Sequence, residues 1–257
     1  MILELKKGLT YGPVRSRRLG ASLGINLFPG DEKLCPFDCV YCQYGRTLRP
    51  VVHLARDQVR LPAPGEVETA LERALESLPA LPAYITFSGN GEPTLHPDFP
   101  EMVNRVISLR NRFGGGMRTA VLSNSARVGN PEVRAALVRL DVSIMKLDCG
   151  TEDTFSRYNR PGPGLNLEGI EEGLRMLSRE VPITVQSLFA AGRDGNMNEA
   201  DTAGWIERLV RIKPAAVQLY TLARGHADYD LRPGPRADLL RMAEEAGNRG
   251  VSVSVFS

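Results

Sequence analysis

Short apolar runs alternate along the chain with longer segments in which apolar residues recur at helical spacing. The positions Val67, Leu71, Ala74, Leu75 and Leu78 are one such helical set. The pattern predicts strands at residues 22–28, 84–87, 118–122, 142–147, 183–189, 216–220 and 251–255. It predicts helices over residues 67–78, 99–113, from 131 onward, 167–177, 200–212 and 236–248, with Asn130 as the cap of the third. Residues 11–20, with their glycines and proline, are predicted to form a loop.

Strands separated by helices predict right-handed crossovers and a parallel sheet, so the fold class is α/β. The chain offers about six strand–helix units and a terminal strand, too few for the eight-unit barrel. In parallel barrels the chemistry gathers at the carboxyl ends of the strands. Unusual residues directly after each predicted strand are therefore the candidates for a functional site.

The composition is that of an ordinary globular protein, with 257 residues, 42% hydrophobic and 24% charged. Residues 1–257 are expected to form one domain. No apolar run approaches 18 residues, and residues 1–7 lack the layout of a signal peptide, so we expect no membrane partner and a cytoplasmic location.

The net charge of +2 is unevenly distributed. Residues 1–60 carry ten Lys or Arg against five Asp or Glu, a sum of +5, which leaves −3 for the rest. This excess is typical of a solvated basic surface, and it is also compatible with an anionic small molecule or RNA as substrate. Arg17 and Arg18 are the candidate substrate-side residues within it.

Three of the four cysteines, Cys35, Cys39 and Cys42, fall within eight residues. Thiolates are soft ligands that select zinc, copper(I) or an iron–sulfur cluster. Zinc sites mostly use paired cysteines with a second pair or histidines, and no second pair is present. Iron–sulfur clusters normally take four cysteines, so three would leave one iron of a [4Fe–4S] cluster open to a substrate or cofactor. Buried hydrophobic packing or a structural zinc site remains the alternative.

The pattern Cys35-x-x-x-Cys39-x-Tyr41-Cys42, with an aromatic residue before the last cysteine, resembles the signature loop of the radical S-adenosylmethionine (radical SAM) superfamily. The resemblance implies a partial, open (β/α)6 barrel with a parallel sheet. Residues 1–30 would be an N-terminal extension and first strand, and residues 31–50 the cluster-binding loop. It also implies a [4Fe–4S] cluster, S-adenosylmethionine (SAM) at its open iron, and an external electron donor of the flavodoxin or ferredoxin type.

The predicted strand ends carry the residues that the resemblance assigns to SAM. The segment Gly89, Asn90, Gly91, Glu92 and Pro93 is similar to the Gly-Gly-Glu-Pro motif that holds the methionine amino group, with Asn90 in place of a glycine. A turn and helix cap is the alternative for this segment. The other assigned residues are Tyr41, Ser123, Asn124, Lys146, Asp148, Ser187 and Tyr220.

Alternative roles stay open at these strand ends as well. Lys146 and Asp148 share a face of their strand, so they form either a ligand site or a structural ion pair. Ser123 and Asn124 also fit a plain turn. Cys149 is either a substrate-side residue or inert packing.

Segments outside the loop resemble one branch, the iron–sulfur oxidoreductases related to the tRNA wyosine-base synthases. Among them are residues 11–20 and the tail Asn159-Arg160-Pro161. The synthases carry further N-terminal cysteines for a second cluster, whereas no cysteine precedes Cys35 here. The resemblance implies an enzyme in which the reduced cluster cleaves SAM to a 5'-deoxyadenosyl radical that abstracts hydrogen from a substrate. A tRNA-modifying version of this enzyme and a non-catalytic zinc or iron–sulfur module are the alternatives.

Overall fold

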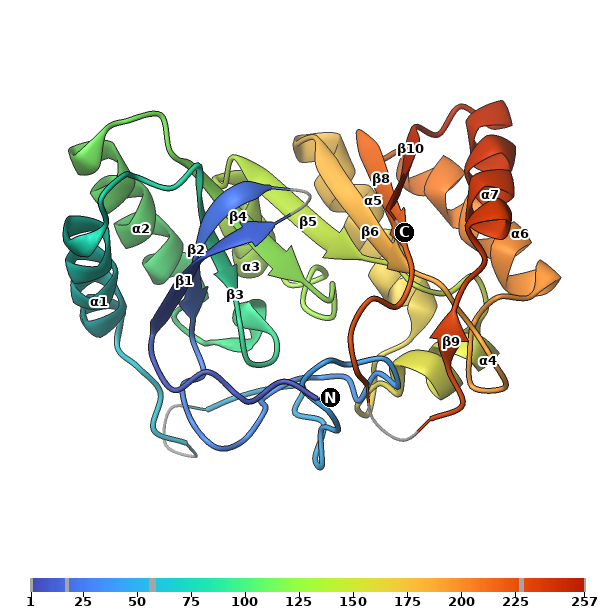
Figure 1. Ribbon diagram of the computed structural model, residues 1–257, viewed down its shortest axis with the longest axis horizontal. Helices are drawn as coiled ribbons and strands as arrows, with labels where there is room; N and C mark the ends of the chain where they lie inside the picture. The colour runs from blue at the N-terminus through green and yellow to red at the C-terminus, as the bar shows by residue number, and fades with distance from the viewer. Residues whose placement is uncertain (1, 17–18, 56–58, 227–228, 257) are drawn as a thin grey trace.

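An eight-stranded sheet forms the centre of the computed structural model, which describes residues 2–16, 19–55, 59–226 and 229–256 (Figure 1). Its strands follow the order β1-β2-β3-β4-β5-β6-β8-β10. Their bounds are Thr10–Ser16, Gly20–Asn26, Tyr84–Ser88, Arg118–Ser123, Val142–Lys146, Ile183–Leu188, Ala216–Tyr220 and Val253–Phe256. β1 is antiparallel to β2, and every other neighbouring pair is parallel.

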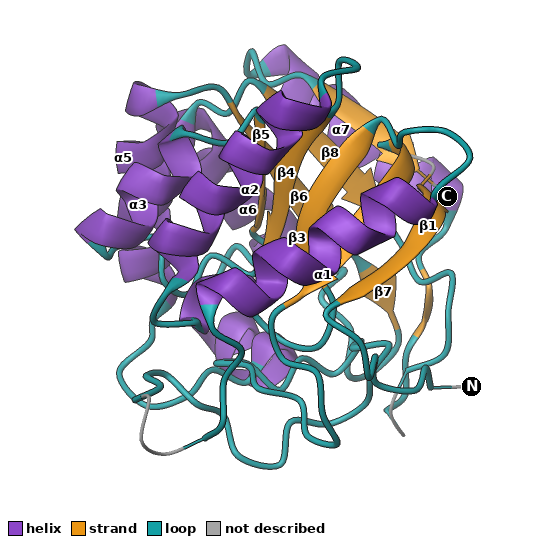
Figure 2. Cartoon of the chain, turned by 90° about the vertical axis from the view of Figure 1, so that its left-hand side faces the viewer, coloured by secondary structure: helices purple, strands orange, loops and turns teal. Residues whose placement is uncertain are grey.

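Six main helices connect the parallel strands and cover one side of the sheet (Figure 2). They are α1 (Pro64–Ser77), α2 (Phe99–Phe113), α3 (Pro131–Val138), α5 (Leu167–Glu180), α6 (Glu199–Ile212) and α7 (Arg236–Asn248). The predicted cap of α3 is confirmed, because the Asn130 side chain accepts hydrogen bonds from two backbone N–H groups of the first turn. Units of one strand and one helix, repeated from β2 to α7, confirm the partial (β/α)6 barrel.

The two faces of the sheet differ in chemistry, as strand alternation requires. The face toward the helices is apolar and at most 2% exposed at Leu23, Ile25, Ile85, Phe87, Val121, Met145, Val185, Val217 and Leu219. The inner face carries polar side chains, among them Thr86, Ser88, Lys146, Thr184, Gln186, Gln218 and Tyr220. The hydrophobic core thus lies between the sheet and its helices, and the inner face is left for polar ligands.

The prediction of a loop over residues 11–20 was wrong at its start, because Thr10–Ser16 forms β1. The glycine and proline that suggested a loop are accommodated by a register irregularity between Tyr11 and Val14. The sequence also did not predict five short elements, because a segment of two to five residues is too short to show a periodic pattern of apolar residues. They are η1 (Pro93–Leu95), α4 (Glu152–Thr154), the π-helical turn η2 (Phe155–Asn159), β7 (Ala190–Ala191) and β9 (Arg232–Pro233).

No helix in the described ranges is both long and apolar enough to cross a bilayer.

Candidate functional site

The loop that carries the three cysteines is held in place by a second segment from far along the chain. Three backbone hydrogen bonds, with N···O distances of 2.8, 3.0 and 3.1 Å, join residues 36–40 to residues 158–162. This second segment follows η2, which ends where Arg160 adopts a left-handed conformation with φ of 50°. Hydrogen bonds to this second segment therefore fix the backbone of residues 36–40.

Each of the three clustered sulfur atoms accepts a side-chain N–H from a different part of the chain. The contacts are Asn124 Nδ2 to Cys35 Sγ at 3.4 Å, Asn159 Nδ2 to Cys39 Sγ at 3.4 Å, and Lys33 Nζ to Cys42 Sγ at 3.3 Å. Donors of this kind stabilise a thiolate more than a neutral thiol. The site is therefore arranged to hold three negatively charged sulfurs.

The chemistry of this donor set fits a [4Fe–4S] cluster. The cysteines are free thiols, and loss of solvation, which is the largest influence, raises the pKa of Cys39 to about 12 and also raises the pKa of Cys35. Iron would replace those protons and supply the positive charge that the half-buried thiolates need. No three His, Cys, Asp or Glu side chains in the described part of the chain are grouped to hold one metal ion. A cluster requires a different arrangement, because each thiolate binds a separate iron.

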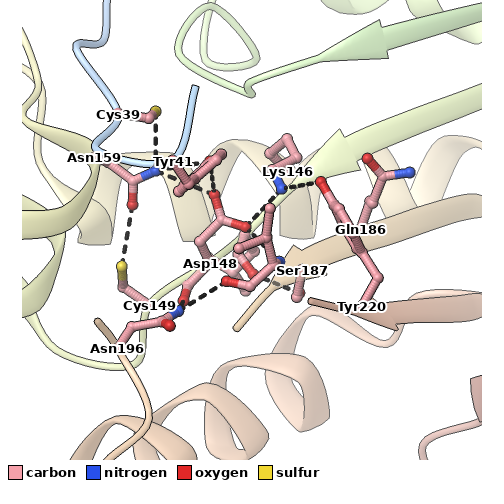
Figure 3. A network of polar contacts seen from close by, with 12 residues as sticks. Cys39, Tyr41, Lys146, Asp148, Cys149, Asn159, Gln186, Ser187, Asn196 and Tyr220 are labelled. Atoms are coloured by element: carbon pink, nitrogen blue, oxygen red, sulfur yellow. Dashed lines mark hydrogen bonds and ion pairs between the residues drawn. The ribbon is translucent and has the colours of Figure 1, made fainter. Parts of the chain in front are cut away.

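Asp148 connects the cysteine loop to the ends of two strands (Figure 3). Its Oδ2 accepts hydrogen bonds from the Tyr41 hydroxyl and, at 3.1 Å, from Asn159 Nδ2. Its Oδ1 accepts the Leu188 N–H at 2.8 Å and lies 2.7 Å from Lys146 Nζ. Asp148 is 3% exposed, and its four partners join the cysteine loop to the ends of β5 and β6. These contacts do not favour the direct contact with SAM that the sequence predicted.

Lys146 presents a positive charge at the carboxyl end of β5. Its Nζ is 2.9 Å from the Tyr220 hydroxyl and lies over the rings of Tyr41 and Tyr220, 5.1 and 4.8 Å from their centroids. Burial acts to lower the pKa of this ammonium, but Asp148 and Tyr220 outweigh it, so its pKa lies above the usual value. Lys146 is therefore a fixed cation, and two of its three N–H groups have partners among the described residues, so the third can serve a ligand.

Glu92, which the motif assigns to SAM, also has a structural role. Its carboxylate is 1% exposed and accepts four hydrogen bonds, two from Thr94, one from the Ser123 hydroxyl at 2.8 Å and one from Asn124 N at 2.6 Å. Burial, the largest influence, raises the pKa of this carboxyl despite those bonds. Glu92 thus fixes the end of β4, including Asn124, through three hydrogen bonds to Oε1 and one to Oε2.

The glycines of the same segment are required by the chain itself. A Cβ atom on Gly91, which has φ of +86°, would lie 1.7 Å from the Leu34 carbonyl oxygen, and one on Gly89 would lie 2.8 Å from Asn26 Oδ1. The sequence predicted close approach of a ligand here, whereas the structure places the cysteine loop against Gly91. Pro93 is buried at the start of η1.

Asn90, which replaces the usual glycine, has a structural role. Its side-chain amide exchanges hydrogen bonds with both backbone groups of Lys6, each at 2.8 Å, and donates to the Phe28 carbonyl at 2.9 Å. The side chain is therefore occupied in holding the N-terminal segment against the loop after β3. Its expected contact with SAM has no support from these bonds.

Ser123 and Ser187 lie on the helix-facing side of the sheet. Ser187 is fully buried, donates to the Leu147 carbonyl and accepts the Trp205 Nε1–H at 2.9 Å from α6. Strand alternation places Gln186, and not Ser187, on the inner face with Lys146. We therefore leave Ser123 and Ser187 out of the site.

The substrate-side candidates fare differently. Cys149 is fully buried, and its S–H donates to Asn159 Oδ1 at 3.0 Å, so it supports Asn159 and does not face a substrate. Arg17 and Arg18 lie outside the described residues. Sequence reasoning missed Lys33 and Asn159. The Asn159-Arg160-Pro161 tail carried a signal, but only the fold brings it to Cys39.

Comparison with known proteins places this site in a family. The model of the Radical SAM superfamily matches residues 33–206, from the cysteine loop into α6. A UPF0026 protein of Synechocystis sp. is 34% identical over 212 residues, which cover 81% of this chain and 73% of that protein. A Brachyspira hyodysenteriae protein named GTPase Obg is 30% identical over 86% of this chain, and the match spans only 31% of its length.

Solved structures share the fold at low sequence identity. A radical SAM methyltransferase from Sphaerobacter thermophilus gives a TM-score of 0.66 at 16% identity, over 91% of this chain and 65% of that one. Streptococcus suis SuiB, solved with S-adenosylmethionine bound, gives 0.64 at 11% identity, over 91% and 50%. TYW1 with a lysine–pyruvate adduct gives 0.57 at 15% identity, over 88% and 73%.

The chain belongs to the radical SAM superfamily. UPF0026 proteins of Synechocystis sp. and Helicobacter pylori are among its relatives. Membership implies a [4Fe–4S] cluster and SAM as cofactors, in agreement with the chemistry of the three sulfurs and their donors.

Proposed function

We propose that this protein is a radical SAM enzyme in which Cys35, Cys39 and Cys42 hold the [4Fe–4S] cluster. The observation that carries the proposal is the set of three side-chain N–H donors, one to each sulfur, which come from the cysteine loop, the end of β4 and the end of η2. When bound, the reduced cluster cleaves SAM and supplies a 5'-deoxyadenosyl radical that removes a hydrogen atom from the substrate. The protein contributes binding, orientation and charge.

The residues proposed to contact SAM surround the cysteine loop on the inner side. Lys146 would pair its remaining N–H with the SAM carboxylate, and the rings of Tyr41 and Tyr220 hold that ammonium in place. Asn124 would border the same ligand from the end of β4, fixed there by Glu92. The backbone of residues 89–93 would form the opposite edge, since it already contacts Leu34.

The substrate would bind over the inner face of the sheet. The polar groups there are mainly uncharged hydroxyls and amides, and Gln186 Nε2 donates to Gln218 Oε1 at 3.0 Å. The cavity between Tyr41, Asn124, Lys146, Asp148 and Asn159 is only about 10 Å3, enough for one water. SAM and substrate would therefore use the open inner side, and the electron would arrive from an external carrier of the flavodoxin or ferredoxin type.

The test is an anaerobic measurement of iron, sulfide and the absorption spectrum, followed by dithionite and SAM with an assay for 5'-deoxyadenosine. We expect about four irons and release of 5'-deoxyadenosine. Cys39→Ala should abolish this release, while Cys149→Ser, a cysteine control that keeps a donor to Asn159, should keep its iron. A colourless, zinc-loaded protein that is inert toward SAM after reconstitution would refute the proposal.

A further inference from the structure

Lys33 is a buried cation beside the cysteine loop. It is 9% exposed, and its Nζ donates to the Gly45 carbonyl and, at 3.3 Å, to Cys42 Sγ. Within the described residues, Lys33 forms no ion pair with a carboxylate. Its charge also acts on the thiol of Cys35. The charge of Lys33 is therefore directed at two of the three clustered sulfurs.

A buried ammonium without a counter-charge is strongly unfavourable, so its retention calls for a nearby negative group. The other two sulfur donors, Asn124 and Asn159, are neutral amides. Among the described contacts to these sulfurs, Lys33 thus supplies the positive charge. Reduction adds one negative charge to the cluster, and a fixed cation stabilises the reduced form more than the oxidised form.

We propose that Lys33 is a positioning residue that raises the reduction potential of the cluster through Cys42. This inference rests on the proposed function, because it needs the cluster in place. In this role Lys33 would make the cluster easier for a biological electron carrier to reduce, which is a different role from binding SAM.

The experiment is an anaerobic redox titration of the reconstituted full chain, followed by visible absorption and electron paramagnetic resonance. Lys33→Met removes the charge and the donor, and Lys33→Gln removes the charge but keeps an N–H. In both variants we expect the ratio of reduced to oxidised cluster at a fixed potential to fall about tenfold, which is about 59 mV for one electron. Lys33→Arg should stay near the wild-type potential.

Lys213→Met is the matched control, because it removes the same charge from the exposed end of α6, before β8. Its titration should overlay that of the wild type. An unchanged potential in Lys33→Met with full iron content would overturn the inference and leave the proposed function intact. A wild-type potential in Lys33→Gln would also overturn it, because hydrogen bonding alone would then suffice. Loss of iron from both variants would instead make Lys33 an assembly residue, which contradicts the proposal.

Discussion

The side-chain amide of Asn159 lies between the sulfur atoms of Cys39 and Cys149. Its Nδ2 is 3.4 Å from Cys39 Sγ, and its Oδ1 accepts the S–H of Cys149 at 3.0 Å. Burial, the largest influence, raises the pKa of the Cys149 thiol well above its usual value, so Cys149 remains a donor. The thiol therefore orients the amide with its N–H toward the cluster ligand.

Asn159→Leu should make the cluster labile, because it removes the donor to Cys39. We expect iron loss to a chelator about tenfold faster than in the wild type, the lower end of the usual effect of such supporting contacts. Cys149→Ser, which keeps a donor to Asn159, should resemble the wild type. Equal iron loss from wild type and Asn159→Leu would contradict this role.

Gly91→Ala should destabilise the protein and displace the cysteine loop. The new Cβ would meet the Leu34 carbonyl, and φ is +86°, so we expect a loss of about 2 kcal/mol or more in the free energy of unfolding. Gly30→Ala is the control, since its Cβ would have no atom within 4 Å. Thermal unfolding and iron content measure both effects, and matching melting temperatures for the two variants would refute the clash.

Lys146→Met and Ser187→Ala should separate ligand binding from packing. Loss of the ammonium should weaken SAM binding about tenfold or more, because a charged hydrogen bond is lost. Ser187→Ala should leave SAM binding unchanged but cost about 1–3 kcal/mol of stability, because the buried Trp205 N–H loses its acceptor. Calorimetric SAM titration and urea unfolding check the pair, and the reverse pattern would restore Ser187 to the site.

The iron-free protein should lose stability at alkaline pH. Burial, aided by Asp148, raises the pKa of Cys39 from 9.0 to about 12 in the folded state. The unfolded chain therefore releases this proton first, so the contribution is fully present below about pH 9 and is lost as the pH rises toward 12. Anaerobic urea unfolding at pH 8 and pH 10 should show the decline, and Cys39→Ala should reduce it. An identical decline in that variant would assign the effect to other groups.

The sequence predicted the parallel sheet and the chemistry of the cysteine loop, because both depend on local signals. The pattern of apolar residues predicted the observed first and last residues of α2, β8 and α7. The alternation of side chains along a strand is likewise a local signal, and it alone places Gln186 and Ser187 on opposite faces of the sheet. The parts that were missed depend on loop conformation or on contacts between distant segments. Lys33 reaches Cys42 only because the irregular loop between them turns back, and Asn159 meets Cys39 across 120 positions. Asn90 belongs with them, since its partners Lys6 and Phe28 lie more than 60 positions away.

The backbone hydrogen bonds between residues 36–40 and 158–162 also bear on how the cofactor is acquired. Because these bonds pair backbone groups of the two segments, we expect the cysteine loop to unfold together with the end of η2. The amides of Asp38 and Val40 should then exchange slowly with deuterium in the iron-free protein. Slow exchange at these amides would mean that the cluster loads onto a loop that is already folded, unlike zinc fingers, which fold only around their metal.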